Sequence, residues 1–200
     1  MCFYSKQGKS AQELQNRFKA KFENETLYQP TIYNGFLFPK TPVITNKQPN
    51  KIQLYNWGLI PFWAKDDSIK KMTLNCKIET AHEKPSFRNV VNNRCLVLAD
   101  GFFEWQWLDD KGKQKKKYEL TMPDNEAFAF AGLYCEWLDK STGELRNTYT
   151  ILTTVANELM SKIHNTKKRM PVIVASDNEQ NWLNGQELKM QNDKLIANEI

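Results

Sequence analysis

Residues 94–105 read RCLVLADGFFEW. The apolar run Arg94–Ala99 has the length of a buried strand, and the Asp100-Gly101 pair that follows it is typical of a turn. On both sides of this stretch, further apolar or alternating runs predict strands at Phe36–Phe38, Val43–Thr45, Lys51–Trp57, Lys117–Thr121, Phe128–Tyr134 and Thr148–Thr154. The lysine-rich tract at 109–117 is interpreted as a hairpin between strands, with a solvated turn favoured over a phosphate contact.

Helix signals are fewer than strand signals. Ser10 and Glu13 form a capping box, and apolar residues at four-residue spacing extend the predicted helix from Ala11 to Phe22. Shorter helices are predicted at Ser86–Val91, at Asn157–Ile163 and around Trp182-Leu183. Because strands dominate without regular alternation with helices, the sequence predicts an α+β fold: one domain over residues 1–200, with a mostly antiparallel, barrel-like sheet and flanking helices.

Composition sets wide limits. The 200 residues are 40% hydrophobic and 26% charged, and the net charge of +5 is compatible with a polyanionic partner. No apolar stretch approaches the roughly 20 residues of a membrane span, and the N-terminus lacks the apolar core of a secretory signal, so we expect a cytoplasmic protein. The four cysteines (Cys2, Cys76, Cys95 and Cys135) form no CxxC pair, so we expect no metal site, cofactor or disulfide.

Cys2 differs from the other cysteines because of its position. An initiator Met1 before a small residue is usually removed, which leaves an α-amine and a thiol on one residue. The α-amine has a pKa of about 7.7–8 against about 10.4 for lysine, so a useful fraction is neutral and nucleophilic at pH 7. An amine attacks an aldehyde to give a Schiff base, and the neighbouring thiol can close a thiazolidine ring. An N-terminal Cys2 is therefore a good aldehyde trap.

Five ordered motifs support a family assignment. They are MC at 1–2, WGLIPFW at 57–63, LNCKIET at 74–80 with EKPSFR at 83–88, CLVLADGFFEW at 95–105, and TTVAN at 153–157 followed by IH at 163–164 and RMPVI at 169–173. At this spacing the chain resembles the SRAP (SOS response-associated peptidase) family from residue 2 to about residue 184. The resemblance implies a single α+β domain around a barrel-like sheet.

The resemblance also implies an activity, the covalent capture of abasic sites in single-stranded DNA through a thiazolidine at the N-terminal cysteine, with lyase-like Schiff-base chemistry. The implied catalytic positions are Cys2, Asn75, Glu104 and His164. The implied partner is single-stranded DNA containing abasic sites, bound by a monomer that associates with the nucleoid. No membrane or cofactor is implied.

Physical roles follow for these side chains. Opening the closed sugar and dehydrating the carbinolamine both require proton transfers, for which Glu104 and His164 are suited. The aromatic neighbours of Glu104 predict that its carboxyl is desolvated, which would raise its pKa. The amide of Asn75 can orient the α-amine or a sugar oxygen. For Glu104 a surface strand-end carboxylate, and for His164 a helix-end histidine, are the structural alternatives.

DNA binding is predicted to use phosphate contacts and stacking. Lys77 and Arg169 match basic positions of the family, and Trp63 and Trp105 are candidates for wedges or stacking platforms, with a core role as the alternative. Lysine at 77 replaces the family's arginine and lacks its bidentate fork. The four residues between His164 and Arg169 widen a gap that is shorter in the family, so the position of Arg169 is in question.

Two other functions remain open. A cysteine peptidase would use Cys2 with His164 and either Asn75 or Glu104, and self-removal of Met1 is the peptidase reaction that fits best. A non-covalent single-stranded DNA-binding module would leave Cys2 inert. Turnover of an unrelated peptide would favour the first alternative, and the absence of a denaturation-resistant adduct would favour the second.

Overall fold

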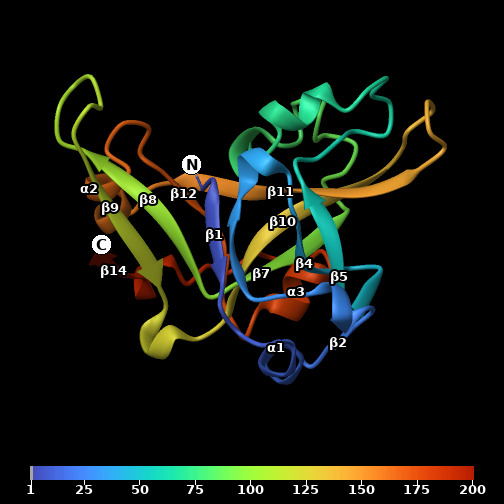
Figure 1. The fold of residues 1–200 in the computed structure, drawn as a ribbon, viewed down its shortest axis with the longest axis horizontal. Helices are drawn as coiled ribbons and strands as arrows, with labels where there is room; N and C mark the ends of the chain where they lie inside the picture. The colour runs from blue at the N-terminus through green and yellow to red at the C-terminus, as the bar shows by residue number, and fades with distance from the viewer. Residues whose placement is uncertain (1) are drawn as a thin grey trace.

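The structure is a computed structural model that describes residues 2–200. Its strands are β1 (Tyr4–Gln7), β2 (Lys21–Phe22), β3 (Thr31–Asn34), β4 (Lys40–Thr45), β5 (Gln48–Trp57), β6 (Asn75–Lys77), β7 (Arg94–Ala99), β8 (Gly101–Trp107), β9 (Lys115–Thr121), β10 (Phe128–Leu138), β11 (Leu145–Val155), β12 (Arg169–Pro171), β13 (Ile173–Val174) and β14 (Ile196–Glu199). The α-helices are α1 (Ala11–Phe18), α2 (Glu158–Ile163) and α3 (Glu179–Leu183). The predicted α+β class and mostly antiparallel barrel are confirmed (Figure 1).

The barrel is closed by strand pairing. β10 pairs with β11 and β7, β4 pairs with β7 and β5, and β5 returns to β11 in a parallel pairing that completes a ring of five strands. β6 also runs parallel to β11, with Asn75 opposite Ile151. The ring therefore holds the start of β6 against its wall, which places the LNCKIET motif at the barrel rim.

A second sheet stands beside the ring, in the order β14-β9-β8-β1-β3. The chain passes from one sheet to the other at Asp100-Gly101, between β7 and β8. The Asp100 carboxylate accepts the Gly8 N–H at 3.0 Å, and the Gly101 Cα lies so close to the next strand that a Cβ there would be 3.3 Å from the Leu120 carbonyl oxygen. The RCLVLADGFFEW stretch thus contributes a strand to each sheet and sets the position of β1, which pairs with β8.

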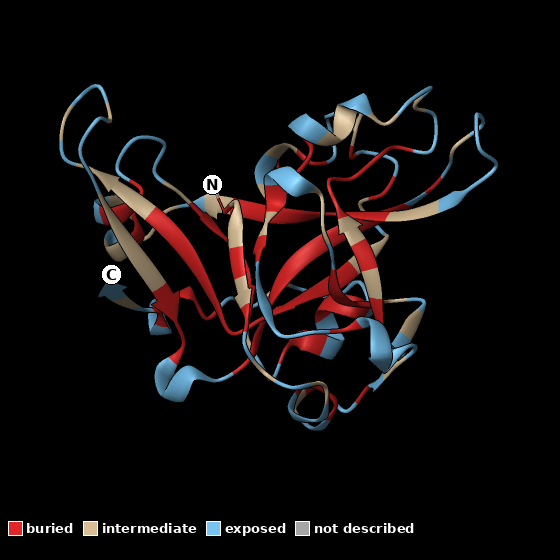
Figure 2. Ribbon diagram, viewed as in Figure 1, coloured by how far each residue is buried: buried red, intermediate tan, exposed pale blue. Residues whose placement is uncertain are grey.

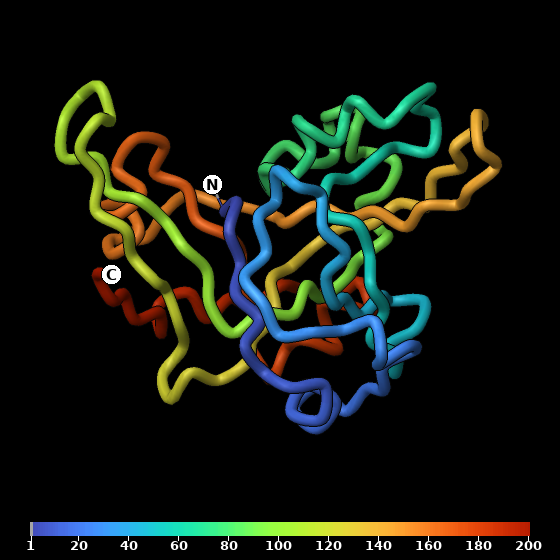
Figure 3. The backbone as a smooth tube through the Cα atoms, in the orientation of Figure 1, coloured from blue at the N-terminus to red at the C-terminus, as the bar shows by residue number. Residues whose placement is uncertain are grey.

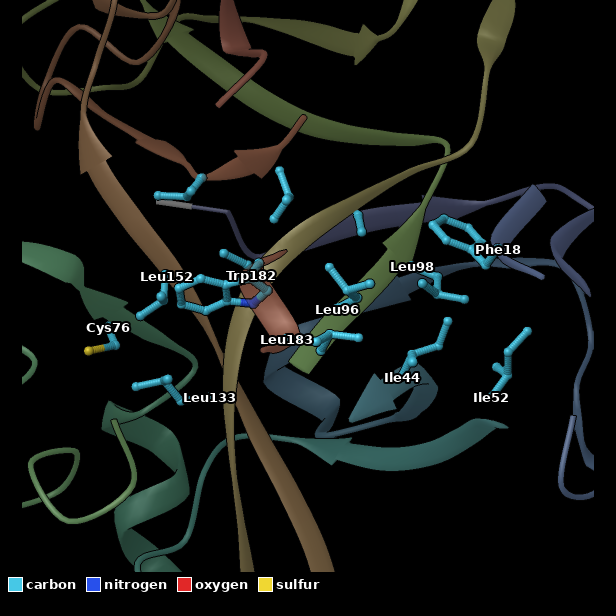
Figure 4. Packing of buried hydrophobic residues seen from close by; sticks show 14 of the residues in the cluster. Phe18, Ile44, Ile52, Cys76, Leu96, Leu98, Leu133, Leu152, Trp182 and Leu183 are labelled. Carbon is cyan, nitrogen blue, oxygen red and sulfur yellow. The ribbon is translucent and has the colours of Figure 1, made fainter. Parts of the chain in front are cut away.

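The core forms two apolar clusters. Figure 4 shows one of them, in which Leu96 and Leu98 of β7 pack with Ile44, Leu152 and Trp182. The other lies between the barrel and the second sheet and is rich in aromatic residues. Figure 2 shows burial concentrated along the central strands, while the loops on either side of the N-terminus are exposed. None of the helices within residues 2–200 has the length and apolar character needed to cross a membrane.

Several predicted elements are confirmed, including the strands at Val43–Thr45 and Lys51–Trp57 and the helix after Asn157, whose side chain caps it by accepting the Met160 N–H at 2.9 Å. The hairpin predicted at 109–117 is also present, and its first residue Asp109 accepts the Lys111 N–H at 2.8 Å. The predicted turn at Asp100-Gly101 is likewise where the chain changes sheets.

Two predicted elements are wrong, and a third, the helix that begins at Ala11 with its Ser10–Glu13 capping box as predicted, ends earlier than predicted. The first helix ends at Phe18 because Lys19 takes a left-handed conformation (φ 52°), and Phe22 enters strand β2, where its ring stacks on Tyr28. The predicted strand Phe36–Phe38 is a 3-10 turn, η2 (Gly35–Leu37), which Asn34 caps by accepting the Phe36 N–H. The predicted helix Ser86–Val91 is a series of turns. For the first helix and for Phe36–Phe38, local backbone conformation, capping or packing overrides the pattern of apolar residues.

Candidate active site

Cys2 lies two residues before the start of β1 and is fully buried. It packs in the aromatic cluster with Trp57, Leu74 and Tyr149, and its Sγ–H donates to the Tyr4 carbonyl oxygen at 3.8 Å. Burial raises the pKa of the Cys2 thiol well above its usual range, and the charge of Glu104 raises it further. The thiol is therefore protonated at neutral pH. Met1, whose removal we predict, lies outside the described residues.

Asn75 opens β6 and reaches the N-terminal residue directly. Its Nδ2 donates to the Cys2 carbonyl oxygen at 2.9 Å. Its Oδ1 is buried and has no hydrogen-bond partner within residues 2–200. The amide therefore fixes the backbone of Cys2 with one end and presents an acceptor in the site with the other.

Glu104 and His164 face each other across the site. The carboxyl comes from the centre of β8 and the imidazole from the C-terminal cap of α2, with 4.0 Å between Glu104 Oε2 and His164 Nε2. Both residues are buried, at 4% and 8% exposure. Burial raises the pKa of Glu104 to about 7 and lowers the pKa of His164 to about 4. The predicted desolvation of Glu104 is confirmed, and the pair can hold a proton on the carboxyl while the ring stays neutral.

The four predicted catalytic side chains thus come from widely separated parts of the chain and meet at the start of β1. The structure brings a protonated thiol, an amide, a titratable carboxyl and a neutral imidazole to one place. That set can move protons at an adjacent electrophile. Within residues 2–200 there is no group of three or more His, Cys, Asp or Glu side chains arranged to hold a metal ion.

The predicted DNA-binding residues differ in accessibility. Lys77 is exposed at the end of β6, and Trp63 is 47% exposed in the loop after Gly58. Trp105 is half-buried on β8, where its ring makes an edge contact with Tyr4 and lies 6.0 Å from the Lys117 amine. Trp63 and Lys77 are free to meet a ligand, while Trp105 offers a partly covered ring near the catalytic set.

Arg169 is already engaged. Its guanidinium donates to both carboxylate oxygens of Glu79, at 2.9 and 2.8 Å, and to the Thr153 carbonyl oxygen at 2.6 Å, and its side chain is 11% exposed. The phosphate contact predicted for Arg169 stays a prediction, but it would require the fork to be shared with or released from Glu79.

The ion pair between Glu79 and Arg169 and the exposure of several large apolar side chains are not predicted by the sequence. Glu79 stands in the same motif as Asn75 and Lys77, which was the available signal. Local sequence patterns give no signal that the large apolar side chains are exposed. They are Phe36, Leu37, Phe62 and Met72, with exposed fractions of 52%, 75%, 59% and 78%.

The structure thus places a buried cysteine at residue 2 beside an amide, a carboxyl and an imidazole. The sequence model described as SOS response associated peptidase (SRAP) matches residues 1–199, and the chain belongs to the SRAP family.

Named relatives are found in bacteria and vertebrates. The chain is 45% identical over 143 residues to abasic site processing protein YoqW of Bacillus subtilis, a match that covers 71% of this chain and 61% of that protein. It is 35% identical over 151 residues to abasic site processing protein HMCES of Gallus gallus, with 64% of this chain and 43% of that protein covered. The chain thus spans less than two thirds of the length of these relatives.

Solved structures share the fold. A crystal structure of a protein from Bacteroides thetaiotaomicron superposes with a TM-score of 0.89 at 36% sequence identity, covering 100% of this chain and 92% of the other. A protein from Bordetella bronchiseptica gives a TM-score of 0.81 at 23% identity, which extends the likeness of fold alone.

Proposed function

We propose that the protein captures abasic sites in single-stranded DNA by forming a covalent thiazolidine at Cys2. The observation that carries the proposal is the burial of Cys2 beside Asn75, Glu104 and His164, and the relatives named abasic site processing proteins support it. The function begins with removal of Met1, which makes the nitrogen of Cys2 a free α-amine.

The chemistry balances without a cofactor. The neutral α-amine adds to the open aldehyde of the abasic sugar, the carbinolamine loses one water, and a Schiff base forms. The Cys2 sulfur then adds to the imine carbon, and its proton passes to the nitrogen as the five-membered ring closes. Because burial keeps the thiol protonated, the amine acts first and the thiol arrives with the proton that ring closure needs.

Glu104 is the proton carrier in this proposal. With a pKa of about 7 it exists in both forms near neutral pH, so it can donate a proton to a leaving hydroxyl and accept one during sugar ring opening. His164 is neutral at the same pH and can relay a proton next to the carboxyl. Asn75 holds the Cys2 carbonyl oxygen and offers Oδ1 to the α-amine or a sugar hydroxyl.

The DNA is held by exposed groups around this set. Lys77 supplies a phosphate contact, and Trp63 supplies a stacking surface for an unpaired base, with Trp105 closer to the reacting sugar. Stacking on open rings needs unpaired bases, so single-stranded DNA should bind better than intact duplex. Arg169 is predicted from the sequence as a second phosphate contact, but its guanidinium is bound to Glu79, and the proposed DNA contacts do not depend on it.

The peptidase alternative is weaker on electrostatic grounds. A catalytic Cys–His pair works as a thiolate beside an imidazolium, which requires a lowered thiol pKa. Here burial raises the pKa of the Cys2 thiol and lowers that of the His164 imidazole to about 4. Both shifts oppose an ion pair. Self-removal of Met1 remains the one peptidase step that the proposal accommodates.

The test combines denaturing gels with intact-mass spectrometry. Full-length protein is incubated with single-stranded oligonucleotide carrying one abasic site. We expect a protein without Met1 and a gel-stable adduct with the mass of both components less one water. Cys2→Ala should lose the stable adduct, while Cys135→Ala, which alters another buried cysteine, should keep it. A stable adduct of wild-type yield in Cys2→Ala would rule the proposal out, and no adduct in wild type would favour non-covalent binding.

A further inference from the structure

The backbone of Arg169 fixes which nitrogen of His164 carries the proton. The Arg169 N–H donates to His164 Nδ1 at 3.2 Å. A backbone N–H can only donate, so Nδ1 must be the unprotonated acceptor, and the neutral ring carries its proton on Nε2. Nε2 is the nitrogen that lies 4.0 Å from Glu104 Oε2. The hydrogen bond from Arg169 to Nδ1 thus places the ring proton on Nε2, the nitrogen on the side of Glu104.

The side chain of Arg169 holds that backbone in place. Its fork is bidentate on Glu79, and one nitrogen also donates to the Thr153 carbonyl oxygen. Glu79 belongs to η4 (Ile78–Thr80), directly after β6, and its Oε1 also accepts the Thr154 hydroxyl at 3.2 Å. A planar fork on a carboxylate fixes orientation as well as distance. The contact ties β12 to η4 across β11.

The pairing of Arg169 with Glu79 fixes one end of the loop between His164 and Arg169. Residues 165–168 are exposed, and Lys168 takes a left-handed conformation with φ 48°. Figure 3 traces this loop beside the connection between β8 and β9, where the Asn165 side chain bonds to the Trp107 backbone at 3.1 and 2.8 Å. Asn165 secures one end of the loop, and Arg169 secures the other.

We infer that Glu79 and Arg169 act as a pair of positioning residues that hold His164 with its Nε2–H directed at Glu104, while the same contact steadies the segment that carries Asn75. The inference rests on the proposed function for its catalytic consequence, but the orientation of the ring is a property of the protein without DNA. It assigns the guanidinium of Arg169 to the protein interior rather than to a phosphate.

The direct test is nitrogen NMR of the imidazoles at neutral pH, without DNA. The sequence contains two histidines, and His82 is an exposed internal reference whose side chain is 69% accessible. We expect His164 to show the Nε2–H tautomer in wild type and in Glu158→Gln, a control on the outer face of α2. Glu79→Gln and Arg169→Gln should give a mixture of tautomers or exchange broadening at His164 alone. Unchanged His164 signals in both variants would overturn the inference. Thermal melting verifies that each variant folds. If Arg169→Gln does not fold, Glu79→Gln still tests the inference, because the Glu79 side chain is 41% exposed and its replacement disturbs the core less.

The rate of crosslinking gives a second test. Single-turnover crosslinking should slow roughly tenfold in each variant, less than the hundredfold that a misplacement of about 1 Å can cost. The double variant should be no slower than the single ones, because both remove the same contact. The salt dependence of DNA affinity should not change. If Arg169→Gln lowers the salt slope by about one contact while Glu79→Gln does not, Arg169 is a phosphate ligand and the inference fails. If wild type forms no adduct but the NMR result holds, the proposed function fails and the positioning pair stands.

Discussion

Two buried glutamates of this protein have different polar neighbours. Glu179 of α3 receives a bidentate pair of hydrogen bonds from Arg17 of α1, at 3.1 and 2.7 Å. Glu104 of β8 faces the imidazole of His164 at 4.0 Å. Burial raises the pKa of both carboxyls. At Glu179 the Arg17 guanidinium counteracts the rise, and at Glu104 the charge of the amino terminus counteracts it and the pKa is about 7.

We interpret Glu179, paired with Arg17, as a structural carboxylate and Glu104, facing His164, as one that takes part in proton transfer. An ion pair with a guanidinium favours the charged form of a carboxylate and opposes the effect of burial on its pKa. The Glu104 carboxyl, with a pKa of about 7, titrates where a proton carrier is needed, at a cost in stability whenever it is ionised. The contrast leads to measurable consequences at each site.

The largest expected effect is on the rate of crosslinking in Glu104→Gln. Removing a general acid–base group costs roughly a hundred- to ten-thousand-fold in rate. Equilibrium binding to DNA should stay nearly intact, because glutamine keeps the shape of the side chain. Single-turnover crosslinking between about pH 5 and 9 is the measurement, and the ionisation near pH 7 should disappear from the profile of the variant. His164→Ala should also slow the Schiff-base steps, including reversal of the adduct.

Glu179→Gln is the matched control for that experiment and should crosslink at the wild-type rate. Wild-type rates in Glu104→Gln and His164→Ala across the pH range would show that Cys2 acts without them.

The second prediction concerns the stability cost of Glu104. Its pKa is about 7 in the folded protein against an ordinary value of 4.5. Between these values the folded state retains a proton that the unfolded state releases, so this group lowers stability as pH rises, by up to about 3 kcal/mol above pH 7 at about 1.4 kcal/mol per pKa unit. Glu104→Gln should therefore be more stable than wild type above pH 7, and the gain should vanish near pH 4.5. Urea unfolding at several pH values measures the gain. A variant that is less stable at every pH would contradict the assignment.

The third prediction concerns the ion pair between Glu179 and Arg17. Glu179→Gln leaves the Arg17 guanidinium without its carboxylate partner in a partly buried position. We expect a loss of about 2 kcal/mol in unfolding free energy, below the 3–5 kcal/mol typical of fully buried pairs because the Arg17 side chain is 27% exposed. Urea unfolding at pH 7 measures it, and crosslinking kinetics should not change. A slower reaction at unchanged stability would mean that the two glutamates are not functionally distinct.

The smallest expected effect is at an exposed charge. Lys77→Gln should reduce the slope of log affinity against log salt by about one phosphate contact, with little change in stability or in the rate at saturating DNA. Fluorescence anisotropy with an uncleavable single-stranded oligonucleotide between low and moderate salt is the measurement. An unchanged slope would remove Lys77 from the DNA-binding surface.

Much of the fold and of the candidate site could be predicted from the sequence. Alternating and apolar runs predicted the strands of the barrel, because burial of one face imposes a period that can be read locally. The aromatic neighbours of Glu104 predicted its desolvation. Motif order brought together Cys2, Asn75, Glu104 and His164 as a set, and the structure places all four around the start of β1.

The contacts of other side chains depend on the three-dimensional fold and could not be predicted from the sequence. Helix α1 ends at Phe18 rather than Phe22 because Lys19 adopts a left-handed turn and Phe22 finds a ring to stack on in a neighbouring segment. The fork of Arg169 is taken by Glu79, a residue 90 positions away, and its backbone selects the tautomer of His164. Hydrogen-bond partners are chosen among groups that folding brings within about 3 Å, and that proximity is set by packing of whole elements, which no local pattern in the chain encodes.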